Sequence, residues 1–316
     1  MKLVFCGTPQ FAVPTLRAVH AAGHEIALVV TQPDRPVGRK QIVEPTRVKQ
    51  VALVEGLAVT QPDKIRTNAE FRMRLAEIAP DAVVVVAYGR IIPPWMLALP
   101  RFGCINLHGS LLPKYRGAAP IQWAVAMGET ITGNTTMLLE EGLDTGPILL
   151  QQEVTIGSEQ TAVDVFEILA EEGAPLMVET LAKLANGSIQ PKMQDHALAT
   201  LAPLLTREDG QMNFAAHTAI EIMNRWRGFQ PWPGAFTRLD GQKLIVHRLE
   251  VFAGEQLGAS EAAEPGTLVV DEGTMRVRCA QGTWLALVEL QAEGKKRMTA
   301  AEFLRGTHLV SGTRLG

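Results

Sequence analysis

The sequence predicts an α/β fold, in which a doubly wound, mostly parallel sheet forms an N-terminal domain and an all-β, OB-like barrel forms a C-terminal domain. Two observations predict this division. Apolar runs alternate with amphipathic segments in the first two-thirds of the chain, and short strand-like runs with glycine-rich turns replace them afterwards. With 316 residues, 47% of them hydrophobic, the chain is long enough for two cores.

Four apolar runs bounded by Gly, Pro or Asp are typical of buried parallel strands. They cover residues 2–6, 25–31, 81–87 and 104–107. Between the runs, apolar residues recur at three- and four-residue steps, which predicts helices over 11–22, 47–55 and 68–79. This βαβ alternation indicates right-handed crossovers between parallel strands.

The pattern changes after Asp144. Residues 147–156 are expected to form an extended strand and residues 162–184 a long helix, which the internal Pro175 should kink or divide. Residues 186–203 mix Gly, Pro, Ser, Gln and Ala-Thr without clear periodicity. We therefore expect a linker over 189–205, between a catalytic domain over 1–188 and a second domain over 206–316. The strands expected in the second domain are 234–238, 243–251, 266–270, 274–279 and 283–290.

Composition excludes several classes of protein. No apolar run approaches the length of a membrane span, and the short N-terminal run is too brief for a signal peptide, so we expect a cytoplasmic protein. The three cysteines lack a CxxC spacing, which argues against a disulfide framework or a zinc site. The net charge is −3, and residues 206–316 carry 13 basic against 13 acidic residues, so any RNA contact must come from local basic patches.

Asn106 and His108 lie at the end of an apolar run that a glycine terminates. Because alternate residues of a strand share a face, both side chains should point the same way. Ligands of open α/β sheets bind at the carboxyl ends of strands, so this position favours chemistry. Asp144 lies between Gly142 and Gly146, in a turn that would bring its carboxylate close to His108.

An amide, an imidazole and a carboxylate form a set suited to acyl transfer. Asn106 would donate a hydrogen bond to the oxyanion that forms when an amine attacks a carbonyl, and a protonated His108 would add positive charge. Asp144 would orient the imidazole and favour its protonated form.

Rival chemistries have weaker support. A serine hydrolase built from Ser110, His108 and Asp144 would lack the G-x-S-x-G turn. The histidines show no HxH or HExxH spacing, so we predict no metal site. The sequence also contains no G-x-G-x-x-G motif and no P-loop, which leaves nicotinamide and ATP chemistry unsupported.

Two segments resemble the signature of the folate-dependent formyltransferase family: residues 106–122, which read NLHGSLLPKYRGAAPIQ, and residues 142–146, which read GLDTG. The resemblance implies 10-formyltetrahydrofolate as the formyl donor and Asn106, His108 and Asp144 as the catalytic residues. It also implies a folate pocket made of three segments. The residues expected there are Val86, Ala87, Tyr88, Gly89, Arg90, Ser110, Leu111, Leu112, Pro113, Leu139, Glu140, Glu141 and Gly142.

Further segments, at 5–14, 32–40, 227–235 and 290–298, are similar to the branch of the family that formylates methionyl initiator tRNA for translation initiation. This similarity implies that the C-terminal domain contacts tRNA. The loop after Gly38 departs from the family, because it is shorter and less basic than expected. The basic residues expected to bind tRNA phosphates are Arg35, Arg39, Lys40, Arg47, Lys49, Lys295, Lys296 and Arg297.

Two other functions remain open at this point. The same centre would also serve an enzyme that formylates the amine of a sugar nucleotide. A non-catalytic RNA-binding protein on an enzyme scaffold would bind tRNA without turnover. We expect a monomer in either case.

Overall fold

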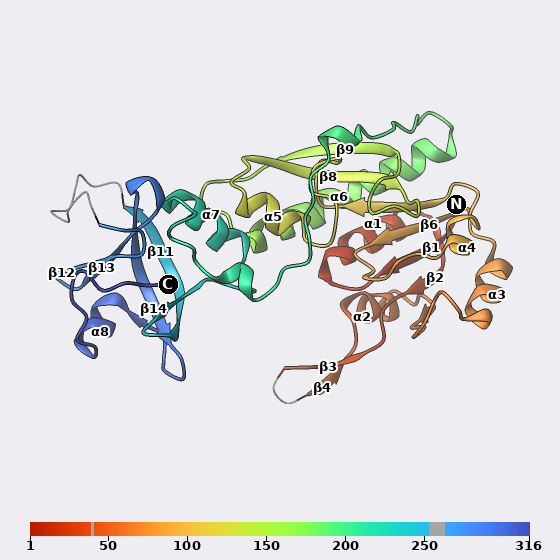
Figure 1. The fold of residues 1–316 in the computed structure, drawn as a ribbon. Helices are drawn as coiled ribbons and strands as arrows, with labels where there is room; N and C mark the ends of the chain where they lie inside the picture. The colour runs from red at the N-terminus through yellow and green to blue at the C-terminus, as the bar shows by residue number, and fades with distance from the viewer. Residues whose placement is uncertain (39–40, 253–262) are drawn as a thin grey trace. The chain divides into compact units, whose positions relative to one another are not determined.

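The computed structural model describes residues 1–38, 41–252 and 263–316 (Figure 1). Its contacts divide the chain into two compact units. The first unit comprises Met1–Ile121, Ile131–Ile156 and Asp164–Pro203, and the second comprises Gln122–Thr130, Gly157–Val163 and Leu204–Gly316. Residues 189–203, expected as a linker, thus pack within the first unit.

The first unit contains a seven-stranded sheet in the order β5-β2-β1-β6-β7-β8-β9. Its parallel strands are β1 (Lys2–Gly7), β2 (Glu25–Val30), β5 (Val59–Thr60), β6 (Ala82–Val86) and β7 (Cys104–His108). Two strands, β8 (Ile131–Leu138) and β9 (Ile148–Thr155), run antiparallel at one edge. The predicted mostly parallel α/β sheet is therefore confirmed.

The predicted helices of this unit are present with small changes at their ends. They are α1 (Val13–Ala21), preceded by the 3₁₀ turn η1 (Gln10–Ala12), then α2 (Arg47–Val54), α3 (Ala69–Ile78) and α6 (Ala162–Ala185). Asparagine and threonine caps explain two of the starts, since Thr46 accepts from the Lys49 amide and Asn68 from the Phe71 amide. Pro175 was expected to kink or divide this helix; α6 continues on both sides of it, so the helix is not divided.

Other elements of the unit were not predicted. They are the short hairpin of β3 (Arg35–Val37) and β4 (Ile42–Glu44), the helices α4 (Pro94–Leu97) and α5 (Pro120–Ala126), the 3₁₀ turn η2 (His196–Leu198), and the strands β5 and β8. Helix α5 contributes residues to both units.

β8 escaped prediction because its buried side chains are polar. Asn134, Thr135 and Thr136 are all fully buried. The hydroxyls of Thr135 and Thr136 and the NH₂ group of Asn134 form hydrogen bonds inside the unit, which lowers the cost of burying them, whereas Oδ1 of Asn134 has no partner among the described residues. The Asn134 amide donates to the Leu169 carbonyl at 2.8 Å, and the hydroxyls of Thr136 and Thr180 lie 2.8 Å apart.

β7 separates its side chains between the two faces of the sheet. Cys104 belongs to an apolar cluster that also contains Phe71 of α3 and Met96 of α4. Leu107 points to the opposite face, where α6 packs so closely that a Cβ on its Gly173 would lie 2.7 Å from Leu107 Cδ2. The even-numbered side chains of β7 therefore share the face covered by α3 and α4.

The second unit contains an antiparallel sheet in the order β10-β11-β14-β13-β12, with β15 paired to β14. The strands are β10 (Phe236–Leu239), β11 (Gln242–Phe252), β12 (Leu268–Asp271), β13 (Thr274–Arg278), β14 (Trp284–Ala292) and β15 (Met298–Thr299). All five predicted strands are present. Two helices were not predicted: α7 (Ala219–Gly228) and α8 (Ala300–Arg305), each of which begins with a Thr–Glu capping box.

All three cysteines, Cys6, Cys104 and Cys279, are free and buried. Burial raises the pKa of both Cys104 and Cys279 to about 12, so these thiols are protonated and unreactive near neutral pH. Among the described residues, no helix is long and apolar enough to cross a membrane.

Candidate active site

β7 holds Asn106 and His108 between two neighbouring strands. Asn106 is opposite Val85 of β6 on one side and Met137 of β8 on the other, so its backbone is fixed by the sheet. The His108 side chain is only 6% exposed, whereas Asn106 is partly exposed. The side-chain amide of Asn106 makes no hydrogen bond with any described residue, which leaves it available to a ligand.

Asp144 reaches His108 through a loop that the sequence did not define. Because β8 is antiparallel to β7, its last residue, Leu138, pairs with Ile105 near the start of β7. The loop that follows then brings Asp144 Oδ2 to 3.8 Å from His108 Nδ1. Asp144 has a φ of 49°, in the left-handed region that aspartate tolerates better than most residues. The structure thus brings together the imidazole and carboxylate that the motifs singled out.

Two backbone groups complete the geometry of this pair. The carbonyl of Tyr115 lies 2.9 Å from His108 Nε2, and because a carbonyl oxygen only accepts, Nε2 carries a proton. Nδ1 is then the ring nitrogen that faces the carboxylate. The amide of Gly117 donates to Asp144 Oδ2 at 2.8 Å. The tight turn between Tyr115 and Gly117 therefore holds both partners.

This arrangement suits transfer of an acyl group to an amine. The Asn106 amide and the His108 ring project from alternate positions of one strand, so they lie side by side on one face. The side-chain NH₂ of Asn106 can donate to an oxygen that gains negative charge in the transition state, and because Nε2 of His108 is bound to the Tyr115 carbonyl, His108 can donate to that oxygen only from Nδ1 of a protonated ring. The Asp144 carboxylate, whose side chain is 14% exposed, can accept a proton from the imidazole or from the attacking amine.

Gly146 allows the Asp144 loop to close. A Cβ at this position would lie 1.9 Å from the carbonyl oxygen of Leu138, so the loop must move if a side chain is added. We expect Gly146→Ala to lower turnover by roughly 100-fold, because a displacement of about 1 Å at a reacting group has an effect of that size. Gly306→Ala, where the nearest contact is an ordinary 3.8 Å, is the matched control. Equal turnover of the two variants would contradict this prediction.

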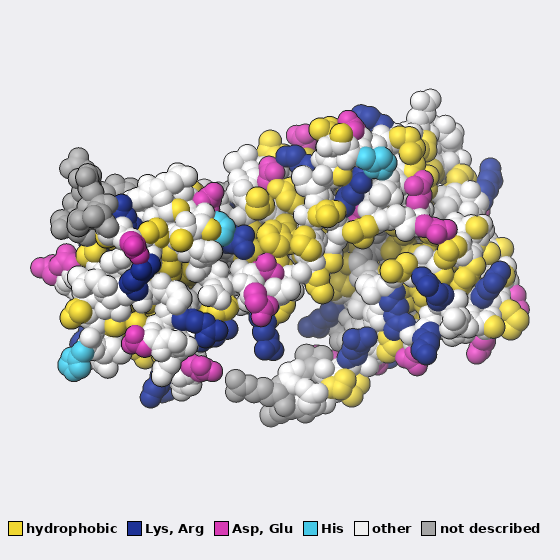
Figure 2. All heavy atoms as spheres, viewed as in Figure 1, with side chains coloured by type: hydrophobic (Ala, Val, Ile, Leu, Met, Phe, Trp, Pro, Cys, Tyr) yellow, Lys and Arg dark blue, Asp and Glu magenta, His cyan; other side chains and the backbone are white. Residues whose placement is uncertain are grey.

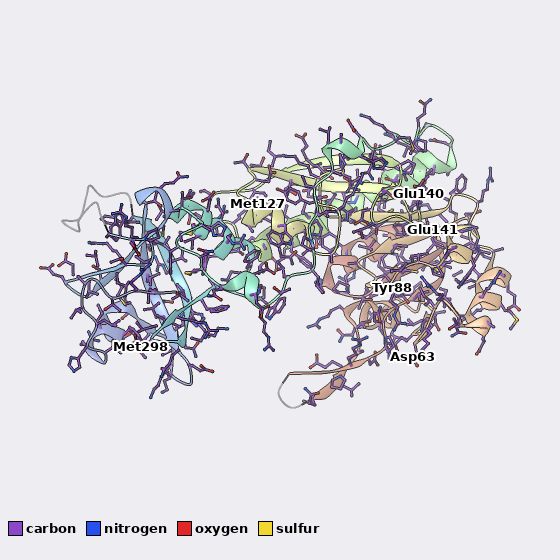
Figure 3. The ribbon with its side chains drawn as sticks, in the orientation of Figure 1. Asp63, Tyr88, Met127, Glu140, Glu141 and Met298 are labelled. Carbon is purple, nitrogen blue, oxygen red and sulfur yellow. The ribbon has the colours of Figure 1, made fainter. Side chains whose placement is uncertain are left out.

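The three segments expected to bind folate converge through Leu139. This side chain packs against the apolar cluster that contains Tyr88 and also against the cluster that contains Leu112. Glu140 and Glu141, which follow it, are exposed (Figure 3). The three segments that contain the expected folate residues therefore lie in one region of the first unit.

Some of the expected folate residues are occupied by contacts within the protein. Ser110 is fully buried, and its hydroxyl donates to the Lys114 carbonyl at 2.7 Å. Tyr88 is 2% exposed, and burial raises the pKa of its phenol. Arg90 donates from Nε to Gln32 Oε1 at 2.9 Å and from Nη1 to the Asp63 carbonyl. A hydrogen bond from the side chain of Ser110 or Arg90 to a ligand would require that the side chain exchange partners, whereas the buried Tyr88 hydroxyl has no hydrogen-bond partner among the described residues.

The basic residues expected to bind tRNA fall into three groups. Arg39 and Lys40 lie outside the described residues. Lys49 and Arg297 are paired with carboxylates, Lys49 with Asp34 at 2.5 Å and Arg297 with Glu289. The hydrogen bond from Lys49 is the main reason why the pKa of Asp34 lies below its usual value.

The remaining candidates are Arg35, Arg47, Lys295 and Lys296, and all four are exposed. Lys295 and Lys296 occupy the turn between β14 and β15, and neither forms an ion pair with a described residue. Figure 2 shows that basic and acidic side chains are interspersed on the visible face, which agrees with the balanced charge of the sequence.

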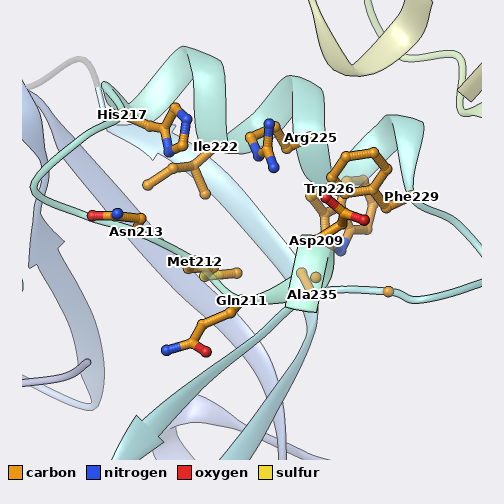
Figure 4. A pocket seen from close by; sticks show the side chains of 12 residues that line it. Asp209, Gln211, Met212, Asn213, His217, Ile222, Arg225, Trp226, Phe229 and Ala235 are labelled. Carbon is orange, nitrogen blue, oxygen red and sulfur yellow. The ribbon is translucent and has the colours of Figure 1, made fainter. Parts of the chain in front are cut away.

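A separate pocket lies within the second unit (Figure 4). It is lined by α7 and the segments on either side, including Asp209, His217, Arg225 and Trp226, and contains none of the predicted site residues. Burial lowers the pKa of Arg225. In the described part of the chain, no group of three His, Cys, Asp or Glu side chains is placed to hold a metal ion.

Comparisons with known proteins show the family to which the chain is similar. The Formyl transferase family matches residues 1–181, and the family Formyl transferase, C-terminal domain matches residues 204–308. The chain is 62% identical to the methionyl-tRNA formyltransferase of Acidobacterium capsulatum, with 100% of both chains covered. It is 53% identical to that of Koribacter versatilis, with 100% of this chain and 99% of the relative covered.

Solved structures with the same fold are more distant in sequence. The sugar 3N-formyl transferase WlaRD, solved with dTDP and 5-N-formyl-THF, has a TM-score of 0.63 and 18% identity over 94% of this chain and 99% of that one. An N-formyltransferase from Helicobacter canadensis, in complex with folinic acid and dTDP-3-aminofucose, has a TM-score of 0.64 and 18% identity over 92% of this chain and 99% of that one.

Proposed function

The chain belongs to the formyl transferase family, and from this premise we propose that it transfers the formyl group of 10-formyltetrahydrofolate to the α-amino group of methionyl initiator tRNA. The product is N-formylmethionyl-tRNA, which serves translation initiation. The observation that carries the proposal is the pairing of His108 with Asp144 beside the available amide of Asn106.

The acceptor amine must be neutral to attack the formyl carbon. An α-amino group with a pKa of about 8 supplies a usable neutral fraction near pH 7, so little base strength is needed. Asn106 and His108 donate hydrogen bonds to the oxygen of the formyl group as it becomes negative. Asp144 receives the proton that the amine loses and passes it, through water, to N10 of the departing folate.

The folate lies against the segments 86–90, 110–113 and 139–142 in this proposal. Leu139, which packs against two apolar clusters at once, supports its flat ring system, while exposed groups of the loop after β8 provide polar contacts. The first unit carries the chemistry, and the second unit contributes contacts to the RNA. No metal takes part.

A side-by-side assay tests the acceptor. Purified protein is incubated with 10-formyltetrahydrofolate and either methionyl initiator tRNA or an amino-sugar nucleotide, and the formylated product is measured. We expect turnover with the tRNA and at least 100-fold lower kcat/KM with the sugar nucleotide. Preference for the sugar nucleotide would support the alternative enzyme, and tRNA binding without turnover would support a non-catalytic RNA-binding protein.

The exposed turn of the second unit leads to a prediction about salt. If Lys295 and Lys296 neutralise tRNA phosphates, the affinity for tRNA falls as salt is added, and each lost contact lowers the slope of log Kd against log salt by about one. We therefore expect the double substitution Lys295→Ala and Lys296→Ala to weaken binding and reduce this slope by about two. Lys183→Ala, whose amine is paired with Glu179 on α6, is the control. An unchanged slope would remove these lysines from the interface.

A further inference from the structure

Residues 194–200, which follow α6 by about ten positions, contact Asp144 directly and His108 indirectly, through Tyr115. We propose that this segment is a positioning device for the reaction, with Gln194 holding the Asp144 loop and Thr200 holding the turn that orients His108. The inference rests on the proposed function, because it assigns these residues a role in the same site. Nothing in the sequence motifs points to them.

Gln194 is bound on both sides of its amide group. The side chain is 6% exposed, and its Nε2 donates to the carbonyl of Asp144 at 2.8 Å and to that of Gly146 at 2.7 Å. Its Oε1 accepts from Nη2 of Arg116 at 2.6 Å and from Nε at 3.1 Å. Since carbonyls only accept and guanidinium groups only donate, only one orientation of the amide satisfies all four contacts.

Arg116 fixes the position of the Gln194 side chain. Its side chain is 6% exposed, and Nη2 also donates to Nδ1 of His196 at 3.1 Å. A buried guanidinium is costly unless its donors are satisfied, and no described carboxylate pairs with it. The oxygen of Gln194 is therefore held firmly, and the NH₂ group of the same amide fixes the loop on its other side.

Thr200 acts on the other partner. Its hydroxyl accepts from the Tyr115 amide at 2.8 Å, and the Tyr115 carbonyl is the group that contacts His108 Nε2. The backbone continues the contact, since the Arg116 amide donates to the Thr200 carbonyl at 2.8 Å and the Ala202 amide to the Arg116 carbonyl at 2.7 Å. Tyr115 has a φ of 60°, a conformation that such neighbouring contacts help to hold.

The two contacts together set the distance between imidazole and carboxylate. Asp144 and His108 come from different elements, and the Gly117–Asp144 hydrogen bond joins the loop after β8 directly to the turn after β7. Gln194 restrains the loop and Thr200 restrains the turn, both from a third segment of the chain. Small shifts of either would lengthen the 3.8 Å separation. Substitutions in residues 194–200 should therefore lower kcat more than they raise the KM for either substrate.

Gln194→Glu is the sharpest test. It keeps the shape and the contact with Arg116 but replaces the NH₂ donor with an oxygen that faces two carbonyls. We expect kcat to fall about tenfold or more, with KM for tRNA and folate within about threefold. Gln190→Ala, at an exposed position in the same stretch of chain, should leave both constants unchanged.

The effect of Gln194→Glu on kcat, compared with and without Asp144, distinguishes a positioning role from a general loss of structure. In an Asp144→Ala background, Gln194→Glu should change kcat by less than about twofold, because the group it positions is absent. An equal decrease in both backgrounds would overturn the inference. Thr200→Val should lower kcat about three- to tenfold and Thr200→Ser should restore it, and because Thr200 is exposed these variants are expected to fold. Failure of serine to restore activity would remove Thr200 from the device.

Amide hydrogen exchange measures how firmly the Asp144 loop is held, without any substrate and whatever the acceptor is. Amide hydrogen exchange across residues 139–147 should be faster in Gln194→Glu than in the wild-type protein or Gln190→Ala, while exchange in β11 and β14 stays the same. Exchange equal to wild type would contradict the proposal that Gln194 holds the loop. An inactive wild-type enzyme with the expected exchange pattern would instead refute the proposed function alone.

Discussion

Asn106→Ala is expected to lower kcat by about 100- to 1000-fold, the usual loss when one oxyanion donor is removed. The side-chain amide of Asn106 makes no hydrogen bond with a described residue, so removing it leaves no buried partner unsatisfied. The strand should keep its geometry, because Val85 and Met137 flank it through backbone pairing. The stability of the protein should therefore change far less than its rate.

This prediction is measured by single-turnover formylation with saturating tRNA and folate. Asn186→Ala, at an exposed position just after α6, is the control for loss of an asparagine amide. Asn106→Asp should be at least as slow as the alanine variant, since it adds a negative charge where the oxyanion forms. Full activity of Asn106→Ala would remove the amide from the mechanism.

Asp144→Asn should reduce kcat by about 100- to 10,000-fold, the range found for loss of a general acid or base. Asparagine tolerates the left-handed backbone of this position, and its side-chain oxygen can still accept from the Gly117 amide. The substitution therefore removes the charge while keeping the loop closed. Asp144→Ala would remove both the charge and this hydrogen bond, so the two variants separate electrostatic from structural effects.

The measurement again is single-turnover rate, with thermal unfolding as the check on folding. Asp240→Asn is the control, because Asp240 is an exposed aspartate in the second unit that has the same φ of 49° as Asp144. If Asp144→Asn transfers formyl groups at the wild-type rate, the carboxylate neither pairs with a charged imidazole nor carries a proton. The role of His108 would then need a different explanation.

Local patterns in the sequence were sufficient for most of the first unit. Continuous Val, Leu and Ile runs predicted β1, β2, β6 and β7 to within about one residue at each end. These strands are buried on both faces, so their sequences carry an unmistakable apolar signal. The alternation of side chains along β7 also predicts that Asn106 and His108 share one face of the sheet.

Hydrophobic patterns did not predict the elements whose buried side chains are polar and hydrogen-bonded. β8 has the sequence ITGNTTML, and its buried asparagine and threonines look like a loop until their partners in α6 are seen. The direction of β8 then decides where the following loop begins. Two helices of the second unit were missed because they are short and lie among irregular segments.

The sequence by itself determined the α/β class, the identity of the amide, imidazole and carboxylate, and the family resemblance, because each depends on residues close together in the chain. Tertiary structure alone decided how Asp144 reaches His108, which nitrogen of the ring faces it, and that Gln194 and Thr200 hold the pair. The contacts of Asp144 with Gly117 and Gln194, and of Thr200 with Tyr115, join residues between 27 and 85 positions apart. No local periodicity records such a distance, since only the folded sheet brings these segments together.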